Sequence, residues 1–244
     1  MNRRTALTLL LAGAALGAAA APRASYANTR RGGGNSARKP QNGDAPLGRT
    51  TDIKRTGVKS ADNFFASVKE IDDRLDRAER ARREGRNALA VGLGLKNGTP
   101  LKDSVREVKT QLAGKVQLGM QADQPSLAPR DNLPPTARSA VDAVNTFFTS
   151  YVGAVRDLAG TPKHAAEVVA KSRGLPQRFK AELQAMGPIG WIQHLDDIRT
   201  LKDNLRITAE LPKRTKVVMD GLNGDLKLMV TAFGGQWPPR LLDR

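Results

Sequence analysis

The chain has 244 residues, no cysteine, and 40 Lys and Arg against 24 Asp and Glu, which gives a formal net charge of +16. The absence of thiols excludes disulfides, iron–sulfur clusters, c-type haem attachment, thiolate metal sites and cysteine nucleophiles. Aromatic residues make up 4% of the chain, so Leu, Val, Ala and Ile must supply most of a hydrophobic core.

The N-terminus has the pattern of an export signal. Arg3 and Arg4 precede an uncharged stretch over residues 5–22 that is rich in Leu, Ala and Gly. Ser25 and Ala27 then supply the small side chains that a signal peptidase requires. We therefore expect a signal peptide over residues 1–27, cleavage after Ala27, and a periplasmic or secreted bacterial protein.

The residues Arg3-Arg4-Thr5-Ala6-Leu7 resemble a bacterial twin-arginine signal. The arginine pair and Leu7 match that class, whereas Ala6 replaces its usual large apolar residue. The mildly hydrophobic core and Arg23, just before the cleavage site, also favour this route. The alternatives are a Sec signal that carries two arginines and an uncleaved membrane anchor over residues 5–22, near the lower limit of about 17–25 residues for a spanning helix.

Residues 28–59 are polar, Gly-rich and basic, with eight basic and two acidic side chains and no apolar period. Such a segment cannot bury enough apolar surface to offset the entropy lost on ordering. The pattern predicts a disordered basic arm that carries a large share of the excess positive charge.

A helical period begins after Ser60, and the first predicted helix runs over residues 61–90. Its apolar stripe consists of Phe64, Val68, Ile71, Leu75 and Ala78. The opposite faces carry four acid-first pairs at i,i+4, each contributing about 0.3–0.5 kcal/mol at most. These pairs are Glu70–Arg74, Asp73–Arg77, Asp76–Arg80 and Glu79–Arg83.

The next segments alternate between helical stripes and breaks. Thr99-Pro100 opens a second helix whose stripe extends to Val116, and residues 121–135, with four prolines, are predicted to be a long loop. A third helix follows Pro135 and ends at Gly160. Two short helices follow, one from Thr161-Pro162 through Ser172 and one around Phe179, Leu183 and Met186.

The C-terminal part is predicted to hold two further helices. One follows Gly187-Pro188, and the last opens at Leu211-Pro212 and ends at Gly234-Gly235. No window shows sustained strand alternation, since the best candidates, residues 88–95 and 206–211, are explained as helix ends. We therefore expect an all-α bundle of about four long and two short helices over residues 60–235, followed by a loose tail over 236–244.

Motifs for catalysis or cofactor binding are missing. His164 and His194 each stand alone, without the spacing that aims two helix residues at one metal ion. No serine turn, Walker loop or Gly-x-Gly-x-x-Gly fingerprint occurs. We expect no cofactor, metal or catalytic residue; the alternative is an exported enzyme of unknown reaction, with His194, Asp197 and Arg199 beside Trp191.

The basic residues are the remaining candidates for a binding site, because clustered Lys and Arg bind phosphate-rich polymers by counterion release. The candidate polyanion-binding residues are Arg30, Arg31, Arg38, Lys39, Lys54, Arg55, Arg80, Arg82, Arg83 and Arg86. No aromatic residue follows Tyr26 in the arm, so base stacking and sequence-specific nucleic-acid binding are not expected. The sequence predicts an exported helical protein with a structural or binding role, whose partner is an anionic envelope polymer, a membrane surface or a protein.

Overall fold

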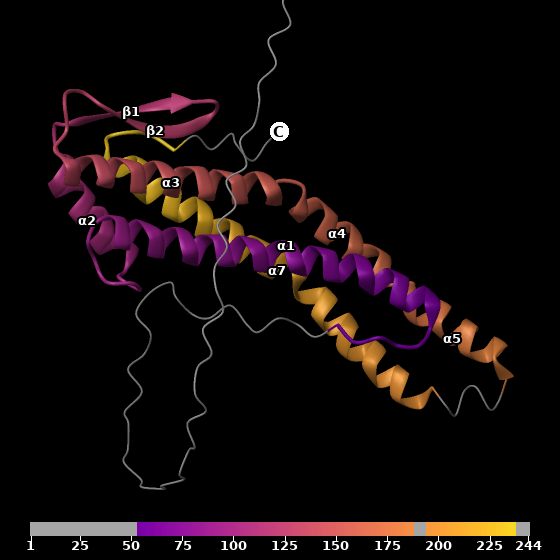
Figure 1. Cartoon of the computed structure of the whole chain (residues 1–244). Coiled ribbons are helices and arrows are strands. Elements are labelled where there is room, and N and C mark those ends of the chain that lie inside the picture. The colour runs from indigo at the N-terminus through magenta and orange to yellow at the C-terminus, as the bar shows by residue number, and fades with distance from the viewer. Residues whose placement is uncertain (1–52, 188–193, 238–244) are drawn as a thin grey trace, which may run out of the picture. The chain divides into compact units, whose positions relative to one another are not determined.

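The computed structural model describes residues 53–187 and 194–237, all of which belong to one compact unit. The expected signal peptide, most of the expected arm and residues 188–193 and 238–244 lie outside the described residues. The described chain is mostly helical, which confirms the all-α prediction (Figure 1). Its elements are α1 (Lys59–Gly92), α2 (Leu101–Leu112), β1 (Val116–Gln121), β2 (Gln124–Pro129), α3 (Pro135–Leu158), α4 (Thr161–Ser172), α5 (Leu175–Ala185) and α7 (Leu195–Ala232).

Three long helices, α1, α3 and α7, form the centre of the bundle. Contacts between α1 and α7 advance in the same direction along both helices, from Asp72 with Arg214 to Arg82 with Asp225, so the two run parallel. Tyr151 of α3 meets Arg82, and Ala143 meets Gly92, so α3 runs antiparallel to α1. From α3, α4 and α5 continue toward the N-terminal ends of α1 and α7 (Figure 1).

The core lies between these helices and is aliphatic, with a cluster of aromatic rings from α3. Phe147 and Tyr151 stack with ring centroids 4.1 Å apart, and both are almost fully buried. The predicted stripes supply most of the surrounding side chains, although Phe65 is more deeply buried than Phe64. Other buried members are Val68, Ile71, Leu75, Val144, Phe148, Val155, Leu222, Leu226 and Met229.

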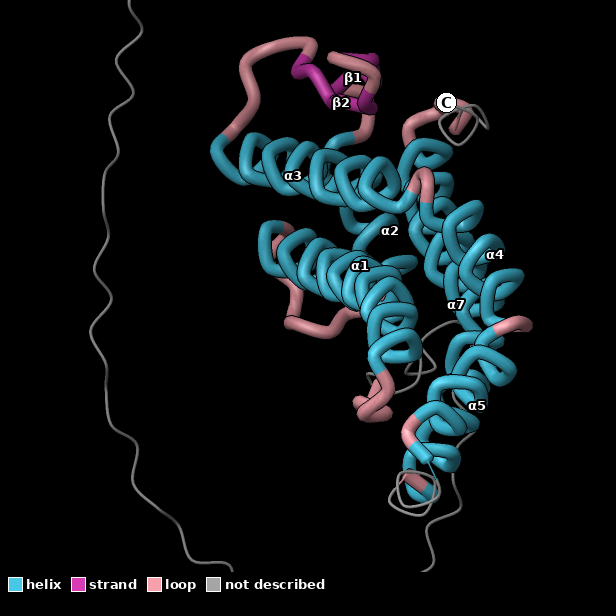
Figure 2. Tube along the Cα trace, turned by 90° about the vertical axis from the view of Figure 1, so that its right-hand side faces the viewer, coloured by secondary structure: helices cyan, strands magenta, loops and turns pink. Residues whose placement is uncertain are grey.

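The prediction of a loop over residues 121–135 was wrong in its first part, and so was the absence of strands. β1 and β2 pair antiparallel around a two-residue turn in which Ala122 and Asp123 have φ values of 50° and 61°. Both views place this hairpin on the face of α3 that points away from α1 (Figures 1 and 2). Asn145 of α3 holds it there, because its side-chain amide bonds both the N–H and the C=O of Leu127.

The predicted break at Pro212 was also wrong, since α7 is one helix with that proline inside it. A proline in a helix interior removes one hydrogen bond and costs about 3 kcal/mol. Leu211 on one side of the proline and Val218 and Leu222 on the other are buried, so packing on both sides holds the helix together. The strand candidates over residues 88–95 and 206–211 are an end of α1 and a part of α7.

The folded body extends beyond both predicted boundaries of the helical domain. Thr56 and Val58 are fully buried, and the backbone of Lys54 exchanges two hydrogen bonds with the side chain of Asn204, at 3.3 and 2.7 Å. Trp237 packs against the core, and its Nε1 donates to Asn223. These polar segments are ordered because α7 supplies side-chain partners. Among the described residues, no helix has the length and apolar character needed to cross a membrane.

Candidate functional site

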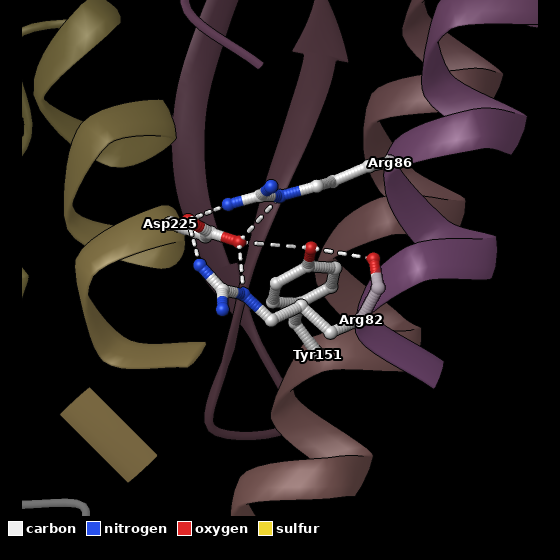
Figure 3. A network of polar contacts seen from close by, with 4 residues as sticks. All are labelled: Arg82, Arg86, Tyr151 and Asp225. Atoms are coloured by element: carbon white, nitrogen blue, oxygen red, sulfur yellow. Dashed lines mark hydrogen bonds and ion pairs between the residues drawn. The ribbon is translucent and has the colours of Figure 1, made fainter. Parts of the chain in front are cut away.

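A buried polar network joins the three central helices (Figure 3). Arg82 and Arg86, one turn apart on α1, both bind the carboxylate of Asp225 on α7 through Nε and Nη2, at 2.8 to 3.1 Å. The Tyr151 hydroxyl of α3 lies 3.0 Å from Asp225 Oδ2 and 2.8 Å from the carbonyl oxygen of Arg82. The carboxylate of Asp225 thus lies within hydrogen-bonding distance of two guanidinium groups and one phenol.

The network sets the protonation of its members. Burial alone would raise the pKa of Asp225, but hydrogen bonds from Arg82 and Arg86 outweigh that effect and lower it. Burial, followed by the negative charge of Asp225, raises the pKa of Tyr151 well above its usual value. Asp225 is therefore a carboxylate and Tyr151 a neutral phenol throughout the physiological pH range, which does not suit proton transfer.

Two glycines make room for this network. A Cβ atom at Gly85 would lie 2.7 Å from the ring of Tyr151, and one at Gly221 would lie 2.6 Å from a guanidinium nitrogen of Arg82. Both glycines lie within long helices, where glycine costs about 1 kcal/mol relative to alanine. The two glycines are present because a larger residue at either position would overlap the tyrosine ring or the guanidinium group.

In a second cluster, the positive charge lies on α7 and the negative charges lie on α1, the opposite of the first cluster. Arg214 of α7 forms ion pairs with Asp72 and Asp76 of α1, and its Nε lies 4.0 Å from Oε1 of Glu79. Burial raises the pKa of Glu79, Arg214 opposes that rise, and Asp76 adds to it. Two opposite charge clusters therefore connect α1 to α7, and both form only at one relative alignment of the two helices.

These clusters change the pairing expected on α1. The predicted pair Glu70–Arg74 is present at 2.6 Å, but Asp73 binds Lys69 instead of Arg77. Asp76 and Glu79 lie within ion-pairing distance of Arg214 and not of Arg80 or Arg83, although the charge of Arg83 still lowers the pKa of Glu79. As a result, three arginines, Arg77, Arg80 and Arg83, are exposed with no described carboxylate within ion-pairing distance.

The predicted polyanion-binding residues therefore divide into three groups. Arg82 and Arg86 are directed at Asp225 inside the bundle, and their side chains are only 16% and 20% exposed, so we leave them out of the proposed binding surface. Lys54 and Arg55 are exposed beside the start of α1, and Arg80 and Arg83 are exposed near its middle. The third group lies outside the described residues and consists of Arg30, Arg31, Arg38 and Lys39.

A groove of about 540 Å³ runs between α1 and α3 beside the exposed arginines. Small residues form much of its lining, and no atom lies within 4 Å of the position that a Cβ would take on Gly153. Polar groups from both helices line the same groove, including two guanidinium groups and two hydroxyls. The lining residues are Arg74, Arg77, Ala78, Ala81, Thr149, Ser150, Gly153, Ala154 and Asp157.

Sequence reasoning missed this groove. Arg77 was assigned to a surface pair with Asp73, which binds Lys69 instead. The spacing of Thr149, Ser150 and Gly153 was the available signal, because it places small polar residues on one face of α3. That face could not be matched to α1 without knowing that the two helices are neighbours.

The alternative site at His194 is partly assembled. Its Nδ1 lies 2.5 Å from Oδ2 of Asp197, and both side chains are about one quarter exposed. Arg199 is exposed and has no hydrogen bond with this pair, and Trp191 lies outside the described residues. Within the described ranges, no group of three His, Asp or Glu side chains is arranged to hold a metal ion.

Comparison with known proteins finds no matching family model, no similar curated protein and no similar solved structure. The candidate function therefore depends on the geometry of the described side chains alone.

Proposed function

We propose that this protein is exported and binds a phosphate-rich polymer or surface outside the cytoplasm through the exposed arginines of α1. The N-terminal pattern of two arginines, an apolar stretch and a small-residue cleavage site supports export. A binding role is favoured over catalysis because the buried charged groups of α1 and α7 neutralise one another inside the bundle.

One observation carries the proposal: two carboxylates in the middle of α1 face inward, whereas three of its arginines face outward. Asp76 and Glu79 face Arg214, and Arg77, Arg80 and Arg83 are exposed along the helix with no carboxylate of the described residues within ion-pairing distance. Their spacing of three residues separates neighbouring Cα atoms by about 4.5 Å along the axis. Guanidinium groups match phosphate geometry better than ammonium groups, because their fork of donors can bind two oxygens at once.

The groove between α1 and α3 extends this surface. Thr149 and Ser150 line it from α3 and offer hydroxyl groups, and Arg77 lines it from α1, while the carboxylate of Asp157 lies in the same lining and disfavours phosphate near that residue. Small residues in the lining allow a bulky headgroup or polymer unit to approach both helices. Lys54 and Arg55, with the four arm residues outside the described ranges, would add electrostatic attraction at longer range.

The test compares binding by two variants of equal net charge. The first replaces Arg77, Arg80 and Arg83 by Gln, and the control replaces three other exposed arginines, Arg130, Arg173 and Arg178, by Gln. The probes are vesicles of phosphatidylglycerol and phosphatidylcholine, pure phosphatidylcholine vesicles, and a duplex DNA as a soluble phosphate array.

We expect the purified protein to bind the anionic vesicles or the DNA, and the α1 variant to bind at least about tenfold more weakly than the control, since each lost contact to phosphate weakens binding. Equal binding by the two variants would refute the assignment to α1. No binding to either anionic probe would refute the function itself. Vesicles and DNA distinguish a membrane surface from a soluble polymer as the source of phosphate.

Export has its own test, independent of binding. We expect the periplasm or culture medium of an expressing bacterium to contain a chain whose first residue is Asn28. An intact N-terminus on a membrane-bound chain would instead support the anchor formed by residues 5–22.

A further inference from the structure

Among the described residues, one edge of the two-stranded hairpin is protected and the other is open. In an antiparallel pair, residues alternate between positions whose backbone groups bond the partner strand and positions whose groups point outward. The turn at Ala122-Asp123 makes Gln121 and Gln124 the closing bonded pair. By that alternation, Leu118 and Met120 of β1 direct their N–H and C=O groups away from β2.

On the outer edge of β2, no residue has a free N–H group that points outward. Pro125 and Pro129 stand opposite Met120 and Val116, so the N–H groups that would point outward are missing. Leu127, the outward residue between them, has its N–H and C=O bound by the side-chain amide of Asn145 at 2.7 and 3.0 Å. This edge therefore offers another strand no free N–H donor.

The outer edge of β1 has none of these protections. The strand reads Val-Gln-Leu-Gly-Met-Gln, with no charged residue and no proline, the two features that proteins commonly use to prevent edge pairing. No described residue hydrogen bonds the outward backbone groups of Leu118 or Met120. The Met120 side chain at this edge is 60% exposed.

We propose that the β1 edge pairs with the β1 edge of a second copy of this chain, forming a four-stranded antiparallel sheet across a two-fold axis. The strand is self-complementary when Gly119 lies at the axis. Leu118 of each copy then stands opposite Met120 of the other, and the two exchange backbone hydrogen bonds. The same alignment brings Lys115 of each copy beside the turn that carries Asp123 of the other.

Two observations favour a second copy over an unrelated peptide. The uncharged strand lets two basic chains meet without like charges facing across the pair, and the charges that flank it, Lys115 and Asp123, are opposite in sign. The pairing also places the exposed side chain of Met120 opposite Leu118 of the other copy, which packs partly against the core of its own chain. Five paired residues in each copy bury less area than a standard interface, so we expect reversible dimers with a dissociation constant of about 10–100 µM.

The deciding variants are Met120→Pro and Met120→Val, measured by sedimentation equilibrium of the full-length purified protein. Proline at position 120 removes an N–H that points outward, as Pro125 does on the other strand, so the hairpin itself keeps its hydrogen bonds. Valine keeps that N–H and an apolar side chain. We expect Met120→Pro to weaken dimerisation at least tenfold and Met120→Val to change it less than threefold, with near-equal melting temperatures.

The salt dependence separates this inference from the proposed phosphate binding. Salt screens the repulsion between two basic copies, so dimerisation should strengthen with added salt, whereas phosphate binding should weaken. Lys115→Glu should weaken the dimer, because it places like charges together. A protein that stays monomeric up to about 1 mM, well above the expected constant, or a dimer that Met120→Pro and Met120→Val affect equally, would overturn the inference.

Discussion

Replacing Asp225 by Asn removes the charge at the centre of the buried network while keeping the shape of the side chain. In the native protein, its two oxygens accept four hydrogen bonds from Arg82 and Arg86. In the variant, the amide nitrogen cannot accept, and the two guanidinium groups lose the carboxylate that lies between them. Arg82 and Arg86 then repel each other across one helical turn.

The size of the effect follows from the burial of the three side chains. Asp225, Arg82 and Arg86 are 9%, 16% and 20% exposed. Breaking a fully buried ion pair costs about 3–5 kcal/mol, and the remaining exposure of the arginines reduces this to about 2–4 kcal/mol. For a domain of this size, that loss lowers the melting temperature by about 5–12 °C.

The assay is urea unfolding followed by circular dichroism at pH 7. A matched control replaces all three charged residues together, as Arg82→Met, Arg86→Met and Asp225→Leu, which removes the two positive charges along with the negative one. This triple variant should unfold with a free energy close to that of the native protein. A loss below about 0.5 kcal/mol for Asp225→Asn, within the range of an exposed ion pair, would refute the account of the network.

Three further predictions concern the same packing. Gly85→Ala should lower the free energy of unfolding by about 1–3 kcal/mol, because the added Cβ would overlap the Tyr151 ring. Gly153→Ala, whose Cβ would enter open space, should raise it by about 0.5–1 kcal/mol. Urea unfolding measures both changes. Because burial raises the pKa of Glu79, its ionised form disfavours folding, so Glu79→Gln should raise the melting temperature at pH 7, and this gain should vanish as the pH falls below about 4. Asn145→Ala should leave the helices intact but accelerate amide hydrogen exchange at Leu127, and unchanged exchange would contradict the clamp.

The helical part of the fold was predictable because its apolar stripes are local. Residues such as Val68, Ile71 and Leu75 repeat at helical spacing, and the structure buries them as expected. The hairpin was missed because its turn is Ala122-Asp123 rather than a glycine-containing pair, and because Pro125 argued against a strand. The alternation of Val116, Leu118 and Met120 was the signal that could have revealed β1.

Features that depend on distant residues were not accessible from the sequence. Nothing near Pro212 indicates that packing would carry a helix through it. Likewise, the i,i+4 spacing of Arg82 and Arg86 places both on one face of α1, but their partner Asp225 is more than a hundred residues away. Surface charges and buried charges look alike until the neighbouring helix is known, which is why these two arginines were expected at the surface.

The salt dependence of DNA binding tests the proposed role of the α1 arginines most directly. The logarithm of the binding constant of a duplex DNA falls linearly with the logarithm of salt concentration, with a slope of about −0.9 per phosphate contact. If Arg77, Arg80 and Arg83 each contact a phosphate, replacing all three by Gln should make the slope shallower by about 2–3. The same slope for this variant and the native protein would contradict the account.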